Sequence, residues 1–377
     1  MYKSTPFVPC ISLLFSASVL AAPPPGPLIV DTGVASNGVM ATVVPDDGLP
    51  LVVFQGSGAV IQTYKCFAAD CSSGGSLANL VPLTARRIRV ALGSDGLPVI
   101  GLSIANSGLR MLKCGNFSCT GGTTLKVLDG ANLGAITDHD LIIPADGLPI
   151  FAYNDGNNGD LKVARCNDGG CSSAQVSVVD SLGSVGTAPA ITLVNGLPQI
   201  AYDANSNALR LAICSDLACS RPASFVNLVA DNPDDTAMLT GRNGAAMIAY
   251  KHDVALSDSL KLIQCNNSAC TAPTVRQLDS IEFGLGLGDG VEMISGADGL
   301  PVLSYVDQTF GTVKLLRCTR QDCATSTITT LHAPATAVLS TNAATALAMS
   351  AQGTPVVGYG VSGASLTLSV CNTRGCL

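Results

Sequence analysis

The chain alternates short apolar runs with turn-forming Gly, Asn, Asp and Pro residues, and this pattern recurs along almost its whole length. In one copy, Asn195-Gly196 lies between two apolar runs, and this dipeptide is typical of a two-residue β-hairpin turn because both positions favour φ > 0. We therefore expect four antiparallel strands in this copy. They are Ala190 to Val194, Leu197 to Asp203, Leu209 to Cys214 and Ser224 to Val229.

The turn glycine marks seven copies of this unit. Repeats of this length, each with four strand-like segments, are typical of a β-propeller, in which every repeat forms one blade. The sequence therefore predicts an all-β fold, a seven-bladed propeller with four antiparallel strands per blade. The glycines are Gly48, Gly96, Gly147, Gly196, Gly244, Gly299 and Gly353.

The two ends of the repeat region are complementary. The last copy contains Ala344 to Ser350, Pro355 to Tyr359 and Ser365 to Cys371, but no fourth strand follows. Leu28 to Asp31 resembles the fourth strand of the third copy. We expect this segment to complete the seventh blade as its outermost strand, which closes the ring and leaves the first strand of each blade lining the central channel.

The cysteines follow the same repeat. The chain has 15, and all except Cys10 fall into Cys-x4-Cys pairs. An even and regular set favours disulfides, and we expect one per blade, flanking the turn between the third and fourth strands so that the two cysteines face each other across them. Zinc is the alternative, but a zinc site needs four ligands together. The pairs are Cys66/Cys71, Cys114/Cys119, Cys166/Cys171, Cys214/Cys219, Cys265/Cys270, Cys318/Cys323 and Cys371/Cys376.

The N-terminal segment has the pattern of a signal peptide. Lys3 precedes an apolar run from Phe7 to Leu20 that is too short to span a bilayer, and small residues end at Ala21. We expect residues 1–21 to be a signal peptide and residues 22–377 to be the propeller. The sequence thus predicts a secreted, periplasmic or cell-surface protein without a membrane span.

Composition narrows the classes of partner. The formal net charge is -7, which disfavours nucleic acid and anionic membranes. Aromatic residues make up 4% of the chain and Trp is absent, which disfavours sugar binding by ring stacking. We expect a monomer with no cofactor and no nucleic-acid partner, whose ligand is an unidentified protein, glycan or small molecule.

One full repeat carries a family resemblance. It contains Asp-Gly-Leu-Pro, an apolar strand, Leu-Lys-x-Ala-x-Cys and Cys-x4-Cys within 146–171. This motif resembles the tandem repeats of exported bacterial seven-bladed propeller proteins, and the resemblance implies the fold without an activity. A looser likeness links Ser94-Asp95-Gly96 to the Asp-box blades of sialidases, although the Trp of that motif is missing.

Charged residues gather where the first strand begins in four of the seven copies. We expect them to converge on one mouth of the channel, and the simpler interpretation is charge balance between the neighbouring Arg and Asp clusters. The alternative is a site for a polar small molecule or a cation, since loops on a rigid scaffold collect binding residues. The candidates are Arg86, Arg87, Arg89, Asp138, His139, Asp140, Asp234, Asp235, Asp289 and Glu292.

These candidates allow two classes of function. The first is a binding or scaffold module that uses the loop face at the channel mouth, which the near-uniform blades favour. The alternative is a sialidase-like glycoside hydrolase or lyase that uses carboxylates at the mouth. His139 between two Asp residues has the composition of a general base, but we expect a solvated loop histidine.

Opposite charges also recur on the second and third strands of the repeats. We expect cross-strand ion pairs between them, each contributing at most about 1 kcal/mol. The alternative is calcium bound by loops such as 154–160, although the same residues are common in turns. The acidic members are Asp155, Asp203, Asp253 and Asp307, and the basic members are Lys162, Arg210, Lys261 and Lys314.

Overall fold

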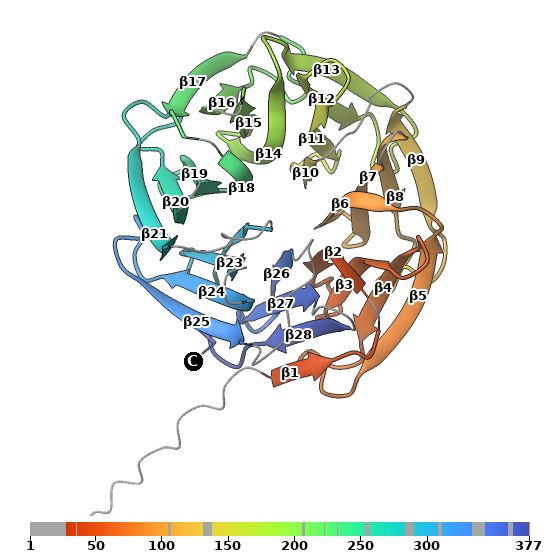
Figure 1. Cartoon of the computed structure of the whole chain (residues 1–377). Coiled ribbons are helices and arrows are strands. Elements are labelled where there is room, and N and C mark those ends of the chain that lie inside the picture. The colour runs from red at the N-terminus through yellow and green to blue at the C-terminus, as the bar shows by residue number, and fades with distance from the viewer. Residues whose placement is uncertain are drawn as a thin grey trace, which may run out of the picture.

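The computed structural model is a ring of seven four-stranded antiparallel sheets, as predicted (Figure 1). The first strand of each blade faces the axis, and the outermost strands form the rim (Figure 1). The structure describes residues 28–34, 36–104, 107–130, 138–205, 208–221, 223–231, 233–252, 257–282, 290–307, 311–333, 344–360 and 365–376.

Each of the first six blades contains four consecutive strands, which run in order from the channel outward. Blade 1 contains β2 (Ser36–Val43), β3 (Leu51–Gly56), β4 (Ile61–Cys66) and β5 (Gly75–Val81); blade 2 contains β6 (Ala85–Leu92), β7 (Pro98–Ile104), β8 (Gly108–Lys113) and β9 (Thr124–Asp129). Blade 3 contains β10 (His139–Ile142), β11 (Ile150–Asp155), β12 (Asp160–Cys166) and β13 (Ala174–Asp180). Blade 4 contains β14 (Val185–Val194), β15 (Leu197–Ala204), β16 (Leu209–Ile213) and β17 (Ser224–Val229). Blade 5 contains β18 (Pro233–Thr240), β19 (Ala246–His252), β20 (Ser257–Gln264) and β21 (Thr274–Glu282); blade 6 contains β22 (Glu292–Ser295), β23 (Pro301–Asp307), β24 (Thr312–Cys318) and β25 (Ser326–His332).

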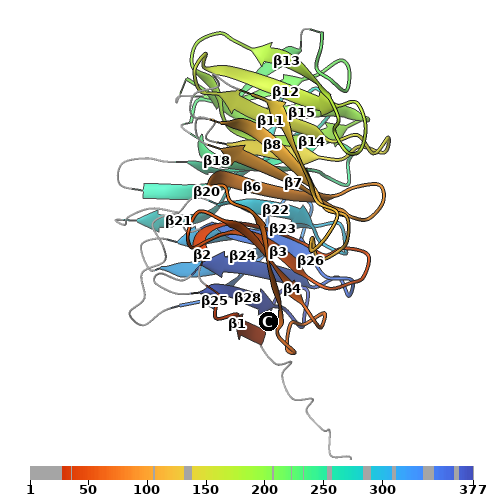
Figure 2. The same ribbon diagram turned by 90° about the vertical axis from the view of Figure 1, so that its right-hand side faces the viewer.

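The seventh blade joins both ends of the ring, which confirms the predicted closure. It contains β26 (Thr345–Met349), β27 (Pro355–Gly360), β28 (Leu366–Val370) and, outermost, β1 (Leu28–Asp31) (Figure 2). The register places Leu28 opposite Val370 and Asp31 opposite Thr367. Because β1 covers the free edge of β28, the hydrogen bonds of the last blade depend on the N-terminal segment.

The turns between the first and second strands place their glycines in the left-handed region. Asn195 and Gly196 have φ of 52° and 77°, which confirms the predicted hairpin turn. In the Asp-Gly-Leu-Pro copies the Asp side chain instead accepts the N–H of the following Leu, as Asp146 does from Leu148 at 3.0 Å. The proline carbonyl then accepts the N–H of the first cysteine, at 2.9 Å between Pro149 and Cys166.

All seven predicted disulfides are present, one per blade. The predicted position of the second cysteine is wrong in every pair, because it does not face the first cysteine across two strands. In blade 1, for example, the residue opposite Cys66 in the ladder is Gly75. The second cysteines, all of which lie outside the strands, are Cys71, Cys119, Cys171, Cys219, Cys270, Cys323 and Cys376.

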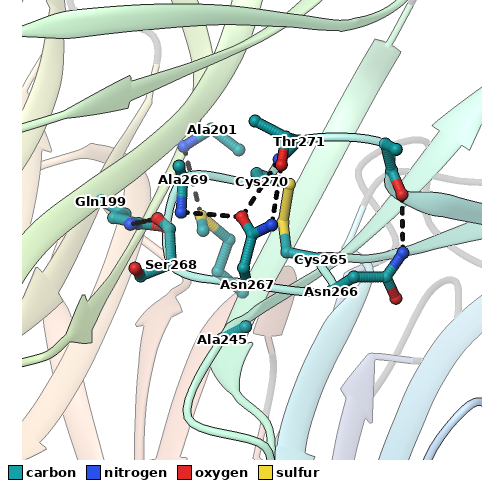
Figure 3. The surroundings of a disulfide bond; sticks show 12 residues. Gln199, Ala201, Ala245, Cys265, Asn266, Asn267, Ser268, Ala269, Cys270 and Thr271 are labelled. Carbon is teal, nitrogen blue, oxygen red and sulfur yellow. Dashed lines mark hydrogen bonds between the residues drawn. A yellow bond between two sulfur atoms is a disulfide. The ribbon is translucent and has the colours of Figure 1, made fainter.

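Each second cysteine instead lies inside a tight turn, where its φ is left-handed, between 45° and 56°. Cys270 has a φ of 51° and donates its N–H to the carbonyl of Asn267 at 3.0 Å (Figure 3). The turn folds the chain back on itself, so the two Cα atoms of a pair lie only 4.6 to 5.0 Å apart. In blades 1 to 6 the disulfide therefore closes a turn that precedes the outer strand.

A buried Tyr–Asp contact joins successive blades at four positions, and we call each contact a latch. In the latch between blades 3 and 4, the Tyr202 hydroxyl donates to Asp180 at 2.6 Å, and Arg210 contacts the same carboxylate at 2.8 Å. The Asp comes from the end of one blade, and the Tyr and the basic residue come from the next blade. The four Tyr/Asp pairs are Tyr153/Asp129, Tyr202/Asp180, Tyr250/Asp231 and Tyr305/Asp279.

The latches revise the predicted cross-strand ion pairs. Two pairs are confirmed, Asp155 with Lys162 at 2.6 Å and Asp307 with Lys314 at 3.0 Å. The pair of Asp203 with Arg210 is wrong, because Arg210 reaches the latch residue of the preceding blade and Asp203 accepts from Thr187. The last pair involves Asp253, which lies outside the described residues, while Lys261 contacts Asp231 at 2.7 Å.

The part of the chain that the structure describes contains no helix with the length and apolarity needed to cross a bilayer.

Candidate functional site

The charged candidates lie where the inner strands begin, in two layers along the channel. On β6, Arg87 and Arg89 are two residues apart, so their side chains lie on the same side of the strand. Asp138 and Asp140 repeat this spacing at the start of β10. We call Arg87, Asp138 and Asp235 the mouth layer, and Arg89, Asp140 and Glu292 the deep layer.

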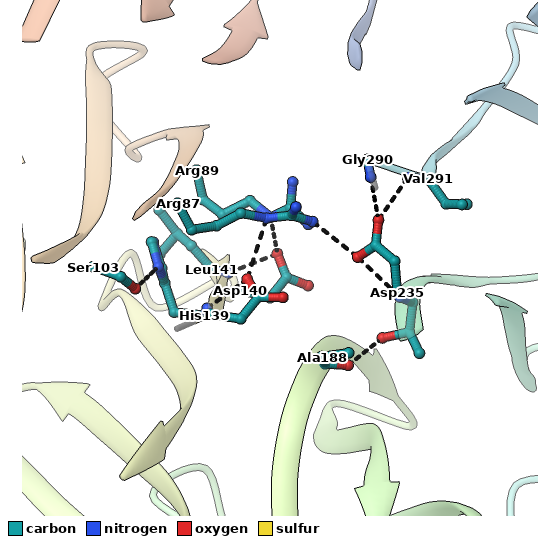
Figure 4. Close-up of polar contacts among 12 residues, drawn as sticks. Arg87, Arg89, Ser103, His139, Asp140, Leu141, Ala188, Asp235, Gly290 and Val291 are labelled. Carbon is teal, nitrogen blue, oxygen red and sulfur yellow. Dashed lines mark hydrogen bonds and ion pairs between the residues drawn. The ribbon is translucent and has the colours of Figure 1, made fainter. Parts of the chain in front are cut away.

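The mouth layer is an ion-pair network that bridges the channel. Arg87 Nε lies 3.2 Å from Asp138 Oδ1, and its Nη2 lies 3.2 Å from Asp235 Oδ1 (Figure 4). The other oxygen of Asp235 accepts the N–H groups of Gly290 and Val291, each at 2.6 Å. A Cβ on Gly290 would lie 2.6 Å from the Cα of Ala344, so a larger residue would disturb this contact. Blades 2, 3, 5 and 6 are thus joined at one level.

The deep layer repeats the arrangement farther along the strands. Arg89 Nε lies 3.4 Å from Asp140 Oδ1, and Arg89 Nη1 also pairs with Glu292 on β22. The second oxygen of Asp140 accepts the N–H of Ile191 at 2.9 Å. Arg89 therefore connects blades 2, 3 and 6, and Asp140 adds blade 4. The two layers confirm that the Arg and Asp clusters pair with each other.

The charges of the two layers do not balance. Two arginines face four carboxylates, so their formal sum is 2 − 4 = −2. Burial raises the pKa of Asp138 to about 6, although Arg87 and Arg89 act in the opposite direction. Burial likewise raises the pKa of Glu292 against the effect of Arg89. The negative charge in the channel is therefore only partly compensated.

The deep layer faces two cavities inside the channel. Arg89, Asp140 and Glu292 line both of them, and the volumes are about 140 Å³ and 300 Å³. The remaining lining residues are mostly apolar and come from the inner strands. In the larger cavity they include Leu141, Ile191, Met238, Leu239 and Met293. Each cavity therefore combines a charged end with apolar walls, as small-molecule sites commonly do.

His139 differs from the expectation. Its side chain is fully buried, so the prediction of a solvated loop histidine is wrong. Nδ1 lies 2.6 Å from the Ser103 hydroxyl, and a Cβ on Gly101 would lie 2.4 Å from Nε2. Burial and the two arginines hold the pKa of His139 well below its usual value. The imidazole is thus a neutral packing element that supports the start of β10.

Three other candidates do not join the layers. Arg86 is exposed on β6. Asp234 is also exposed and pairs with Lys251 at 2.9 Å. Asp289 lies outside the described residues. The structure thus brings together Arg87, Arg89, Asp138, Asp140, Asp235 and Glu292, with His139 packed beside them.

Sequence reasoning missed the apolar and hydroxyl residues of the cavities. Thr192, Thr240 and Ser295 line the larger cavity at the ends of β14, β18 and β22. These residues could have been found from their position near the end of an inner strand, which the repeat pattern predicts. Chemical type alone did not distinguish them from other strand residues.

The described residues of the site do not form a metal centre. Within the described ranges, no three His, Cys, Asp or Glu side chains gather at metal-binding distance. In the loop proposed for calcium, the Asp155 carboxylate accepts from Asn157 N, Asn158 Nδ2 and Lys162 Nζ. These contacts are those of a turn stabilised by an Asp side chain.

Solved structures resemble this chain in fold, whereas no protein family resembles it in sequence. No protein-family model matches the chain, and no curated protein matches it. A solved protein of unknown function from Dyadobacter fermentans is 14% identical with a TM-score of 0.56, covering 92% of this chain and 99% of its own. A fungal alcohol oxidase in complex with copper is 11% identical with a TM-score of 0.58, covering 91% and 75%. BBS1N in complex with ARL6DN is 12% identical with a TM-score of 0.57, covering 93% and 98%.

At these identities the similarity concerns the fold alone. The chain is a seven-bladed β-propeller with one disulfide per blade. Seven disulfides are typical of proteins from oxidising compartments.

Proposed function

We propose that this propeller is an exported binding module whose ligand occupies the central channel against the deep layer. The observation that carries the proposal is that both cavities share Arg89, Asp140 and Glu292. In the mouth layer the side chains of Arg87 and Asp235 are only 13% and 4% exposed, so this layer offers a ligand little accessible polar surface. We therefore place the contact in the channel beneath the mouth layer.

Binding is favoured over hydrolysis by the state of the carboxylates. A glycoside hydrolase needs one carboxyl group as an acid and another as a base or nucleophile, both directed at the substrate. Asp140 is held by Arg89 and by the N–H of Ile191, and Glu292 is also held by Arg89. Such ion pairs position a polar ligand more readily than they activate water.

A thermal-shift screen of the purified protein tests this function. The comparison protein is the triple variant Arg89→Met/Asp140→Asn/Glu292→Leu, which removes the three charges and keeps an acceptor oxygen for the N–H of Ile191, so we expect the fold to be retained. Small molecules that raise the Tm of the natural protein should leave the triple variant unchanged. Turnover of chromogenic glycosides that is lost in Glu292→Gln would overturn the proposal in favour of the hydrolase.

A further inference from the structure

The larger cavity has a charged end and an open polar end. Arg89, Asp140 and Glu292 form the first end, and Thr192, Thr240 and Ser295 line the second. Glu292 and Ser295 begin and end β22, so the two ends lie about 10 Å apart at the usual rise of a strand. Thr240 and Ser295 are exposed. The cavity therefore opens toward the turns and disulfides, at the face opposite the mouth layer.

The wall between these two ends is apolar. Met238 and Met293 lie within it, and their flexible thioethers can adapt to different ligand shapes. This wall offers no regular set of polar side chains that could bind the hydroxyl groups of a sugar ring. A ligand that fills the cavity therefore needs an apolar body. The apolar lining residues are Leu141, Ile142, Ile191, Ala237, Met238, Leu239 and Met293.

The charge at the deep-layer end of the cavity selects the head group of the ligand. The two layers carry four carboxylates and two arginines. A ligand carboxylate would add negative charge to a site that already has an excess, whereas an ammonium group would reduce that excess. Burial is the main cause of the raised pKa values of Asp138 and Glu292, and the neighbouring carboxylate of Asp235 raises both further.

On the basis of the proposed function, we propose that the ligand is a small organic cation, an alkylamine with an unbranched apolar chain. It enters from the disulfide face and places its ammonium group against Glu292 and Asp140. Its chain lies along Leu141, Met238 and Met293. Apolar burial supplies most of the affinity, and the ammonium group supplies the selectivity.

Isothermal titration calorimetry with three matched probes tests the ligand class. The probes are n-hexylamine, n-hexanol and n-hexanoate, which share one apolar chain and differ in head group. We expect n-hexylamine to bind about tenfold or more tightly than n-hexanol, the scale of a buried charge-assisted contact, and n-hexanoate to bind least. Preferential binding of n-hexanoate or n-hexanol would overturn the amine proposal while leaving a binding function in place. If no probe binds and the thermal-shift screen finds no channel ligand, both proposals fail.

Two matched tryptophan variants test the direction of entrance. Ser295→Trp places a large side chain at the open end, and Arg86→Trp places the same side chain on the opposite, loop-face side. Both positions are exposed, so both proteins should fold, which far-UV circular dichroism checks. We expect Ser295→Trp to abolish n-hexylamine binding and Arg86→Trp to leave it unchanged. The reverse result would place the ligand at the loop face and contradict the proposal.

Discussion

The latches at the blade boundaries and the charged layers of the channel are both networks of buried polar groups, but only the latches repeat. Four latches use the equivalent Tyr in successive blades, and in three of them the Asp occupies the same register position, while Asp231 lies two residues beyond it. The mouth and deep layers each occur once among the described residues, and they use blades 2, 3, 5 and 6 unequally. A contact repeated at four blade boundaries serves the ring, whereas a contact formed once marks a particular place in it.

The two regions also differ in how well they stabilise negative charge. Burial raises the pKa of Asp180, but the Tyr202 hydroxyl and Arg210 outweigh this effect, so the pKa is lowered overall. In the channel, burial outweighs both arginines and the pKa of Asp138 is raised to about 6. The latch at Asp180 thus stabilises its carboxylate, and the channel retains that of Asp138 at a cost to stability. This difference supports a role for the channel beyond folding.

The largest effect is expected for Arg87→Ala. The variant leaves Asp138 and Asp235 buried without their cation, and breaking such a pair costs about 3–5 kcal/mol of the free energy of unfolding. Urea denaturation measures the loss. The control is Arg87→Met/Asp138→Asn/Asp235→Asn, which removes all three charges, keeps an acceptor oxygen for the N–H groups of Gly290 and Val291, and should recover most of the stability. A loss in Arg87→Ala below about 1 kcal/mol, the level of a surface pair, would contradict the buried mouth layer.

An intermediate effect is expected for Tyr202→Phe. The variant removes a hydrogen bond to a charged carboxylate, and such bonds contribute about 1.5–3 kcal/mol. Tyr359→Phe is the matched control, because that hydroxyl meets the neutral Ser369 at 3.3 Å and should cost about 1 kcal/mol or less. Equal losses in the two variants would show that the latch carboxylate adds nothing to the contact.

The pH dependence should have opposite signs in the two regions. The folded-state pKa of Asp138 lies above its ordinary value of 3.8, so the stability it contributes is present at low pH and is lost as the pH rises through about 6. The pKa of Asp180 is lowered, so its contribution is present above pH 3.8 and is lost as the pH falls below that value.

The contributions of Asp138 and Asp180 are measured by comparing the unfolding free energies of Asp138→Asn and Asp180→Asn with that of the natural protein. The comparison runs from below pH 3.8 to above about pH 6. Parallel slopes in the two comparisons would contradict the contrast between channel and latch.

The smallest effect is expected for Asp234→Asn. Its carboxylate is 43% exposed, and its partner Lys251 keeps Asp258 at 3.7 Å as a second carboxylate, so the free energy of unfolding should change by about 0.5 kcal/mol or less. Chemical denaturation gives this value, and n-hexylamine binding should also be unchanged. A large loss of binding would extend the site beyond the two layers.

The repeat pattern predicted most of the fold because it encodes periodic features. The turn glycines, the paired cysteines and the strand Leu28–Asp31 all occupy positions that a closed ring requires. The latches were missed because Asp180 and Tyr202 belong to different repeats, and the pattern within single copies does not show contacts between neighbours. The order of residues along one strand also does not show which residue of the adjacent blade a side chain contacts.

The sequence predicted where the candidate site lies, but it predicted less well which side chains form it. Charge at the start of four inner strands indicated the channel, and six of the ten candidates form the two layers. For the remaining candidates, the sequence did not show which side chains are buried. His139 faces Ser103 inside the sheet while Asp234 faces solvent, and a two-residue alternation does not say which charged side chain points inward.

The most direct test of the channel as a ligand site is a crystal structure of the protein soaked with an n-hexylamine that carries bromine at its far end. The account predicts an anomalous bromine peak in the larger channel cavity near Thr240 and Ser295, with the ammonium group at Glu292 and Asp140. A bromine peak at the loop face above Arg87, or an ammonium group placed away from the deep layer, would contradict it.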